Sequence, residues 1–216
     1  MGKMVTKREK SIYKLKEKNL LLIFTRNPEL GKCKTRLAAK IGNQAALEVY
    51  KFLLHHTVTI TKNLNVTKQV QYSVAVREND LWSSKNYEKR QQFGDDLGQR
   101  MENAFKQGFN DGYQNIIIIG SDIYDLTQAD LDNAFKQLET HDYVIGPAQD
   151  GGYYLFGMKS LNSQVFKNKV WGTETVLKDT LNDLQKSNVK LLEERNDVDY
   201  YEDIKDVDVF QKFLNQ

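Results

Sequence analysis

Unbroken apolar runs alternate with helical segments along this chain, and this alternation constrains the fold more than any other feature of the sequence. Residues 20–24 (LLLIF) and 115–119 (NIIII) are almost wholly apolar, which is typical of strands buried on both faces of a parallel sheet. Residues 70–76 (VQYSVAV) are rich in β-branched and aromatic side chains and predict a third strand. We expect these three strands to lie in one sheet.

Helical periodicity fills the intervals between the strands. Apolar side chains recur at three- and four-residue spacing in residues 43–60, which predicts a long amphipathic helix. The same patterns predict the remaining elements, which are helices at 97–109, 126–139 and 173–186 and strands at 143–146, 152–158 and 189–194. Thr127 and Asp130 have the spacing of a capping box, and Asp199 and Glu202 have it ahead of a closing helix. The alternation predicts a single-domain α/β protein with a mostly parallel sheet flanked by helices.

Composition limits the function classes. The 216 residues carry a net charge of +2 and are 40% hydrophobic, so a full core is expected and no global field favours nucleic acid or a membrane surface. A single cysteine excludes an internal disulfide. No apolar run reaches the roughly 18 residues that span a bilayer, and no signal peptide is recognisable, so we predict a cytoplasmic protein. Residues 1–18 are predicted to be a polar N-terminal extension and residues 19–216 the domain.

Three polar segments follow predicted strands, and the first is basic. In open α/β sheets ligands bind beyond the carboxyl ends of the strands, so the segments after 20–24, 115–119 and 143–146 should line one crevice. The first segment reads RNPELGKCKTRL (26–37). It is not a P-loop, because Cys33 stands where Ser or Thr should be. A site for phosphate or diphosphate is expected, with a solvated charge run as the alternative. The expected phosphate-binding residues are Arg26, Gly31, Lys34 and Arg36.

The other two strand ends are acidic. Asp122 follows Gly120 and Ser121 directly after a predicted buried strand, where a hard cation can be held beside a ligand's phosphates. Asp125 is interpreted as a turn or cap residue. Asp150 opens an Asp-Gly-Gly corner between two predicted strands, and a bare turn would also explain that corner.

Six blocks of the sequence occur in the order seen in a known family. They are RNPELGKCKTRL, GDDLGQRMENAF, GSDIYDL, GPAQDGGYYLFGM, VWGTETV and DVDYYEDI. From about Leu20 to the C-terminus the chain resembles bacterial GT-A-type glycosyltransferases, a group that includes arsenosugar-biosynthesis and selenodomain-associated transferases. The resemblance implies a nucleotide-diphospho-sugar transferase fold, related to sugar-nucleotide and molybdopterin-type nucleotidyltransferases. Tyr124 is a departure, because the family usually has proline two residues after the aspartate of GSD.

The resemblance also implies roles for individual residues. Asp122, together with Asp150, is expected to hold a divalent metal, either Mg²⁺ or Mn²⁺. Asp150 and Arg36 are the expected catalytic residues, and Arg100 is expected to reach a phosphate or the acceptor. The expected substrate-binding residues are Gly151, Gly152, Tyr153 and Trp171. For Trp171 simple packing is an equal alternative, and Asp199 is interpreted first as a helix cap.

These residues favour one function and leave two others open. The lead hypothesis is a metal-dependent glycosyltransferase that takes a nucleotide-sugar donor and a small-molecule acceptor. The alternative is a nucleotidyltransferase that joins a nucleoside triphosphate to a phosphorylated acceptor and releases pyrophosphate. A nucleotide-binding module without turnover is the third hypothesis, favoured if Tyr124 distorts the metal site.

Overall fold

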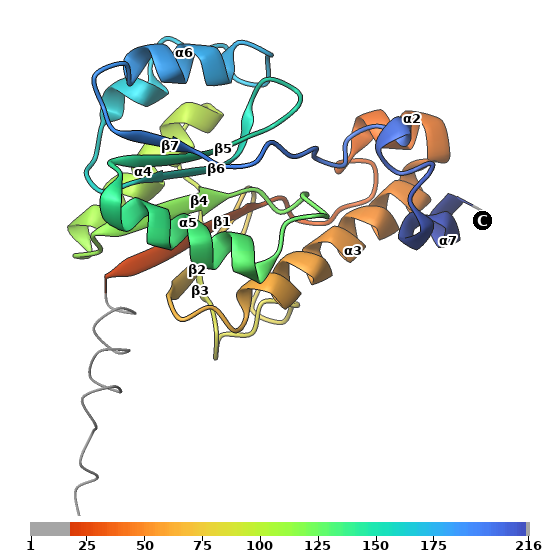
Figure 1. The fold of residues 1–216 in the computed structure, drawn as a ribbon. Coiled ribbons are helices and arrows are strands. Elements are labelled where there is room, and N and C mark those ends of the chain that lie inside the picture. Colours follow the sequence, from red (N-terminus) through yellow and green to blue (C-terminus); the bar gives the residue numbers. More distant parts are fainter. Residues whose placement is uncertain (1–17, 215–216) are drawn as a thin grey trace, which may run out of the picture.

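The computed structural model describes residues 18–214, which form an α/β domain around one seven-stranded sheet (Figure 1). The strands are β1 (Asn19–Thr25), β2 (Thr67–Tyr72), β3 (Glu88–Gln91), β4 (Asn115–Ile119), β5 (Tyr143–Pro147), β6 (Tyr153–Met158) and β7 (Val189–Leu191). Their order is β3-β2-β1-β4-β6-β5-β7. Within the described range β6 alone runs antiparallel to its neighbours. The predicted mostly parallel sheet is therefore confirmed. The expected N-terminal extension lies outside the described residues except for Lys18.

Helices cover both faces of the sheet (Figure 1). The α-helices are α2 (Thr35–Ile41), α3 (Asn43–Thr61), α4 (Leu97–Asn110), α5 (Gln128–Thr140), α6 (Val176–Asp183) and α7 (Gln211–Leu214). Three short 3-10 helices are η1 (Ser163–Phe166), η2 (Tyr201–Asp203) and η3 (Asp208–Phe210). No helix among residues 18–214 has both the length and the apolar character needed to cross a bilayer.

The central strands are buried on both faces, as their apolar sequences predict. Leu21 and Ile23 of β1 belong to the core cluster that includes side chains of α3 and α5, whereas Leu20 and Leu22 belong to the cluster that includes α4. All four side chains have 0% exposure, and burying each contributes about 1.5–3 kcal/mol. Parallel pairing of β1 with β2 and with β4 places the carboxyl ends of these strands, and hence the loops that follow them, at one edge of the sheet.

Several element boundaries differ from the sequence-based expectations. β2 ends at Tyr72 instead of residue 76, because the backbone N–H of Val74 turns away to bond the Asn27 side chain (3.1 Å). The polar edge strand β3 was not predicted. The capping box of Thr127 and Asp130 is confirmed. The cap expected at Asp199 is wrong, because Asp203 accepts the N–H groups that open η2 and the Asp199 carboxylate turns elsewhere.

Candidate functional site

The loop after β1 is held rigidly by buried polar contacts. The Asn27 side chain, 5% exposed, donates to the carbonyl of Ala75 (2.8 Å). The Tyr50 hydroxyl from α3 bonds both backbone groups of Arg26. Cys33 is buried, and its sulfur bonds backbone groups of the same loop, which fits a structural role. These contacts fix the backbone that carries the basic residues.

Lys34 is the most buried cation of this loop. Its backbone has φ 48° and ψ 48°, the left-handed conformation, which costs a non-glycine residue about 1–3 kcal/mol and is often found at functional sites. Its side chain is only 5% exposed, and Nζ donates to Asp122 Oδ2 (2.8 Å) and Asp199 Oδ1 (2.6 Å). Burial favours the neutral amine, but the two carboxylates outweigh that effect and raise the pKa of Lys34. The ammonium is thus a fixed positive charge.

Asp122 and Asp199 belong to a group of three carboxylates that also contains Asp197. One carboxylate oxygen from each lies within 4.8 Å of the others. Asp122 follows β4, and the other two lie in segment 192–199 after β7, on either side of Val198, which is buried at a bend of the chain. The Val198 N–H donates to the Asp122 carbonyl (3.1 Å). This bond holds the bend beside Asp122, and the carboxylates on either side of Val198 both lie near the Asp122 side chain.

The surroundings of Asp197 disfavour the negative charge of its carboxylate. Burial first, and then the charges of Asp122, Asp199 and Asp150, raise the pKa of Asp197 to about 6, with Lys34 opposing. Three clustered oxygen donors of this kind are the ligands that Mg²⁺ and Mn²⁺ prefer. The mutual repulsion of the carboxylates would be relieved by a cation, so the donor set fits a divalent metal.

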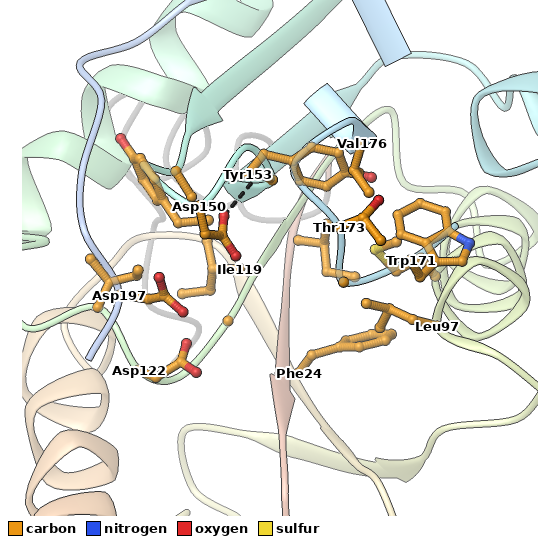
Figure 2. A pocket seen from close by; sticks show the side chains of 18 residues that line it. Phe24, Leu97, Ile119, Asp122, Asp150, Tyr153, Trp171, Thr173, Val176 and Asp197 are labelled. Carbon is orange, nitrogen blue, oxygen red and sulfur yellow. Dashed lines mark hydrogen bonds between the residues drawn. The ribbon is translucent and has the colours of Figure 1, made fainter. Parts of the chain in front are cut away.

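Asp122 and Asp197 line one end of a cavity of about 210 Å³ (Figure 2). Asp150, in the loop between β5 and β6, points toward the same space from the other side, and its Oδ1 accepts the N–H of Gly152 (2.8 Å). Asp150 is not part of the three-carboxylate group. The structure therefore brings Asp122 together with Asp197 and Asp199, which were not predicted as metal ligands.

The Asp-Gly-Gly corner is shaped by a close backbone contact. Gly151 has φ +85°, and a Cβ there would come within 2.2 Å of the Glu174 carbonyl oxygen. The Gly151 carbonyl accepts the N–H of Leu177 (2.9 Å). Only glycine fits this position, and the contact joins the Asp150 corner to the segment that carries Trp171.

The opposite end of the cavity is apolar. It is lined by Phe24 of β1, Leu97 and Met101 of α4, Trp171, and Val176 of α6. The Tyr153 ring also lines it and packs edge-on against Trp171, with ring centroids 6.5 Å apart. Burial raises the pKa of the Tyr153 hydroxyl, so this group stays neutral.

The remaining predicted site residues lie outside the cavity lining. Arg36 is 55% exposed and bonds Asp199 Oδ2 (3.2 Å) from the solvent side. Arg26 and Gly31 are exposed on the same loop. Arg100 lines a second cavity beside β3, of about 470 Å³, and its Nε donates to the Gly94 carbonyl (3.0 Å). The structure thus gathers the basic loop near Asp122 but not Arg100.

Tyr124 points away from the carboxylates. Its ring packs against Phe52 and His56 of α3 and against Phe210 of η3, with centroids 5.1–5.7 Å apart. The side chain therefore anchors the C-terminal segment to α3, and the Asp122 carboxylate keeps its place in the group of three.

Sequence reasoning missed Asp197 and treated Asp199 as a cap. The available signal was the spacing of two acids around an apolar residue in DVDYYEDI (197–204). The chain bends at Val198, and this spacing alone does not predict that both carboxylates come to Asp122.

Comparisons with known proteins give a family match and similar solved structures. Residues 54–173 match the family DUF2064, described as "Uncharacterized protein conserved in bacteria". The crystal structure of a "putative nucleotide-diphospho-sugar transferase" from Desulfovibrio desulfuricans G20 has 30% identity and a TM-score of 0.80, covering 91% of this chain and 94% of that one. No curated protein matches the sequence significantly.

More distant structures share the fold alone. A 4-diphosphocytidyl-2C-methyl-D-erythritol synthase from Anaerococcus prevotii DSM 20548 has 9% identity and a TM-score of 0.57, covering 94% of this chain and 98% of that one. Rv0371c of Mycobacterium tuberculosis H37Rv, solved in complex with manganese, has 13% identity and a TM-score of 0.54, covering 92% and 98%. The family match spans more than half of the described chain, and the protein belongs to the DUF2064 family.

Proposed function

We propose that this protein is a metal-dependent transferase that moves a sugar from a nucleotide-sugar donor to a small-molecule acceptor. The observation that carries the proposal is the group of Asp122, Asp197 and Asp199, with one oxygen from each within 4.8 Å, beside a cavity at the carboxyl edge of the sheet. Support also comes from the 30% identical relative, whose name describes a nucleotide-diphospho-sugar transferase, and from the manganese complex of a protein with the same fold.

The residues around this group have complementary roles in the proposal. A Mg²⁺ or Mn²⁺ ion held by the three carboxylates would neutralise negative charge on the diphosphate leaving group. Lys34 and Arg36 already contact the Asp199 carboxylate, so both cations lie where they can add positive charge beside the same diphosphate. Gly31 and Arg26, on the same loop, are the further phosphate contacts that we propose.

Asp150 is the proposed base. During transfer the bond between the anomeric carbon and the diphosphate oxygen breaks, and the acceptor oxygen bonds to that carbon. The acceptor proton must then go to a base within hydrogen-bond reach. Asp150 points into the cavity without an ion-pair partner among the described residues, which leaves its Oδ2 open to the acceptor.

Nucleotidyl transfer is the second candidate. It is favoured by the fold shared with a diphosphocytidyl-methylerythritol synthase, and the same carboxylates and cations would serve it. The sequence after β1 contains a single glycine in residues 26–37, so it lacks the glycine-rich loop that cradles a triphosphate in many such sites. We therefore rank this reaction second.

Product identity separates the two reactions. Nucleotide sugars and nucleoside triphosphates are tested as thermal-shift ligands with and without Mn²⁺, because a ligand specific to the native state raises the midpoint. The ligands that bind are then incubated with candidate acceptors. Release of nucleoside diphosphate from a nucleotide sugar supports the proposal, and release of pyrophosphate from a triphosphate supports the second candidate. If no ligand shifts the midpoint with Mn²⁺ present, neither reaction is supported.

A further inference from the structure

The cavity has two chemically different ends, and the apolar end has no role in binding a diphosphate. Its acidic end is formed by Asp122, Asp150 and Asp197, and these three are the charged residues in the lining of the whole cavity. Among the described residues no Lys, Arg or His side chain lines the cavity. The basic residues that suit phosphate lie on the other side of the carboxylates, at Lys34 and Arg36. Phosphate oxygens therefore have no partner at the apolar end.

The apolar end is also poor in partners for a nucleobase or a second sugar. Both of these groups carry several donors and acceptors that must be hydrogen-bonded when buried. The Thr173 hydroxyl lines the cavity but already donates to the Val170 carbonyl (2.7 Å). The remaining wall at this end consists of Phe24, Leu97, Met101 and Val176 and the rings of Tyr153 and Trp171. The Tyr153 hydroxyl is buried beside Thr180.

Trp171 is held against this wall by a close approach to α4. A Cβ at Gly98 would come within 2.3 Å of the indole Nε1 of Trp171, so glycine at this helical position allows the contact. Tyr153 packs against the other side of the indole. Leu97, next to Gly98, is 45% exposed and lines the cavity. Half-exposed apolar side chains in a preformed pocket are typical of a ligand site.

We propose, resting on the transferase function above, that the acceptor is a neutral alcohol with an apolar body about the size of one ring. The apolar body lies among Phe24, Leu97, Met101 and Trp171, and the hydroxyl points to Asp150 (Figure 2). The whole cavity, acidic end included, has about 210 Å³ and sets an upper limit on the size, because an apolar cavity of about 150 Å³ is known to hold benzene. The carboxylates of Asp122, Asp150 and Asp197 at the other end repel an acidic acceptor.

The chain supplies its own reporter for this site. It contains two tryptophans. Trp82 is 1% exposed and packs on Tyr87, so its fluorescence is a constant background, whereas Trp171 lines the cavity. The probe is 2-phenylethanol, titrated into the full chain without nucleotide or metal. The matched control ligand is phenylacetate, which keeps the ring and replaces the hydroxyl end with a carboxylate.

Saturable quenching by 2-phenylethanol, with phenylacetate binding at least tenfold more weakly, is the expected result. Leu97→Ala should weaken binding about fivefold to tenfold, as expected for the loss of roughly 40–60 Å² of apolar contact. Gly98→Ala should weaken it at least as much by displacing the indole, and Leu97→Ala remains the test if that variant does not fold. Val170→Ala is the control, because Val170 adjoins Trp171, is 70% exposed and does not line the cavity.

Equal binding of the two ligands, or no saturable quenching, would overturn the inference. A parallel titration with nucleotide sugar and Mn²⁺ separates this failure from failure of the proposed function. If the nucleotide sugar binds and 2-phenylethanol does not, only the acceptor assignment is lost. If 2-phenylethanol binds and no nucleotide does, the transferase proposal fails and the acceptor role fails with it.

Discussion

Two segments of opposite charge meet at Asp122, and they are positioned in different ways. The loop after β1 carries Lys34 and directly follows a strand with an unbroken apolar sequence, and Asn27 and Tyr50 anchor it to other parts of the chain. The segment after β7 carries Asp197, follows a short edge strand and is held by backbone bonds of Arg195 and Val198 to distant loops. A basic loop that directly follows a strongly patterned strand can be recognised from the sequence. A segment placed only by distant contacts cannot, although it brings two of the three clustered carboxylates.

The largest effect is expected where the two segments meet. Asp122→Asn removes one partner of Lys34 and one member of the carboxylate group while keeping the size of the side chain. Turnover with a nucleotide sugar should fall about 100- to 1,000-fold, the usual cost of losing one electrostatic contact to the transition state, with folding retained. The control is Asp125→Asn, because Asp125 pairs with Arg195 and lies outside the group. Similar kinetics for both variants would contradict a special role for Asp122.

Removing the buried cation tests the role of the loop after β1. Lys34→Ala should weaken binding of the nucleotide diphosphate by about 1–3 kcal/mol, the value of a charge-assisted contact. It also leaves Asp122 and Asp199 without their shared partner, so a divalent ion should stabilise this variant more than the wild type. Calorimetry and thermal unfolding with and without Mn²⁺ measure both effects. Lys32→Ala is the control, because the Lys32 side chain is 74% exposed and, within residues 18–214, its one ion-pair partner is Glu29. Equal, small effects of both substitutions would mean that the basic residues of this loop are a solvated charge run and do not bind phosphate.

Replacing Asp197 and replacing Asp199, the two acids of segment 192–199, should change the free energy of unfolding in opposite directions. The pKa of Asp197 is raised from 3.8 to about 6, so its contribution to stability is full below pH 3.8 and is lost as the pH rises through about 6. Asp197→Asn should therefore increase the free energy of unfolding by about 1–3 kcal/mol at pH 8, and by nothing at pH 4. Asp199→Asn should decrease it by about 1–2 kcal/mol, because Lys34 loses a partner.

Chemical denaturation with chelator present, at pH 4 and pH 8, measures both variants of this pair. If Asp197→Asn increases the free energy of unfolding equally at the two pH values, the gain does not come from titration of Asp197. Destabilisation of equal size in both variants would show that the two acids are equivalent, which contradicts the difference in their partners.

The smallest effect is expected for Arg36. Its guanidinium is 55% exposed, bonds Asp199 and lies 5.4 Å from the Tyr200 ring centre. Exposed pairs of this kind contribute little, so Arg36→Ala should change the free energy of unfolding by less than about 0.5 kcal/mol. Nucleotide affinity should fall by about 1 kcal/mol. A large loss of stability in urea denaturation would mean that Arg36 is structural and would weaken its assignment to phosphate.

The sequence was sufficient to predict most of the sheet and part of the site. The apolar runs at β1 and β4 predicted strands buried on both faces, and the rule that ligands bind at strand ends pointed to Lys34 and Asp122. These residues lie next to elements with strong local patterns. Asp197 was missed because its position depends on a backbone bond to a loop about 75 residues away in the chain. The C-terminal end of β2 was predicted four residues too late for a similar reason, since the contact between Val74 and Asn27 has no local signal.

The most direct test of the account is a titration of the free protein with Mn²⁺, followed by electron paramagnetic resonance. We predict one Mn²⁺ per chain in the wild type, with affinity at least tenfold lower in Asp122→Asn and in Asp197→Asn. Asp150→Asn should keep the wild-type affinity, because Asp150 lies outside the three-carboxylate group. Unchanged Mn²⁺ binding in Asp122→Asn, or a loss confined to Asp150→Asn, would contradict the metal site proposed here.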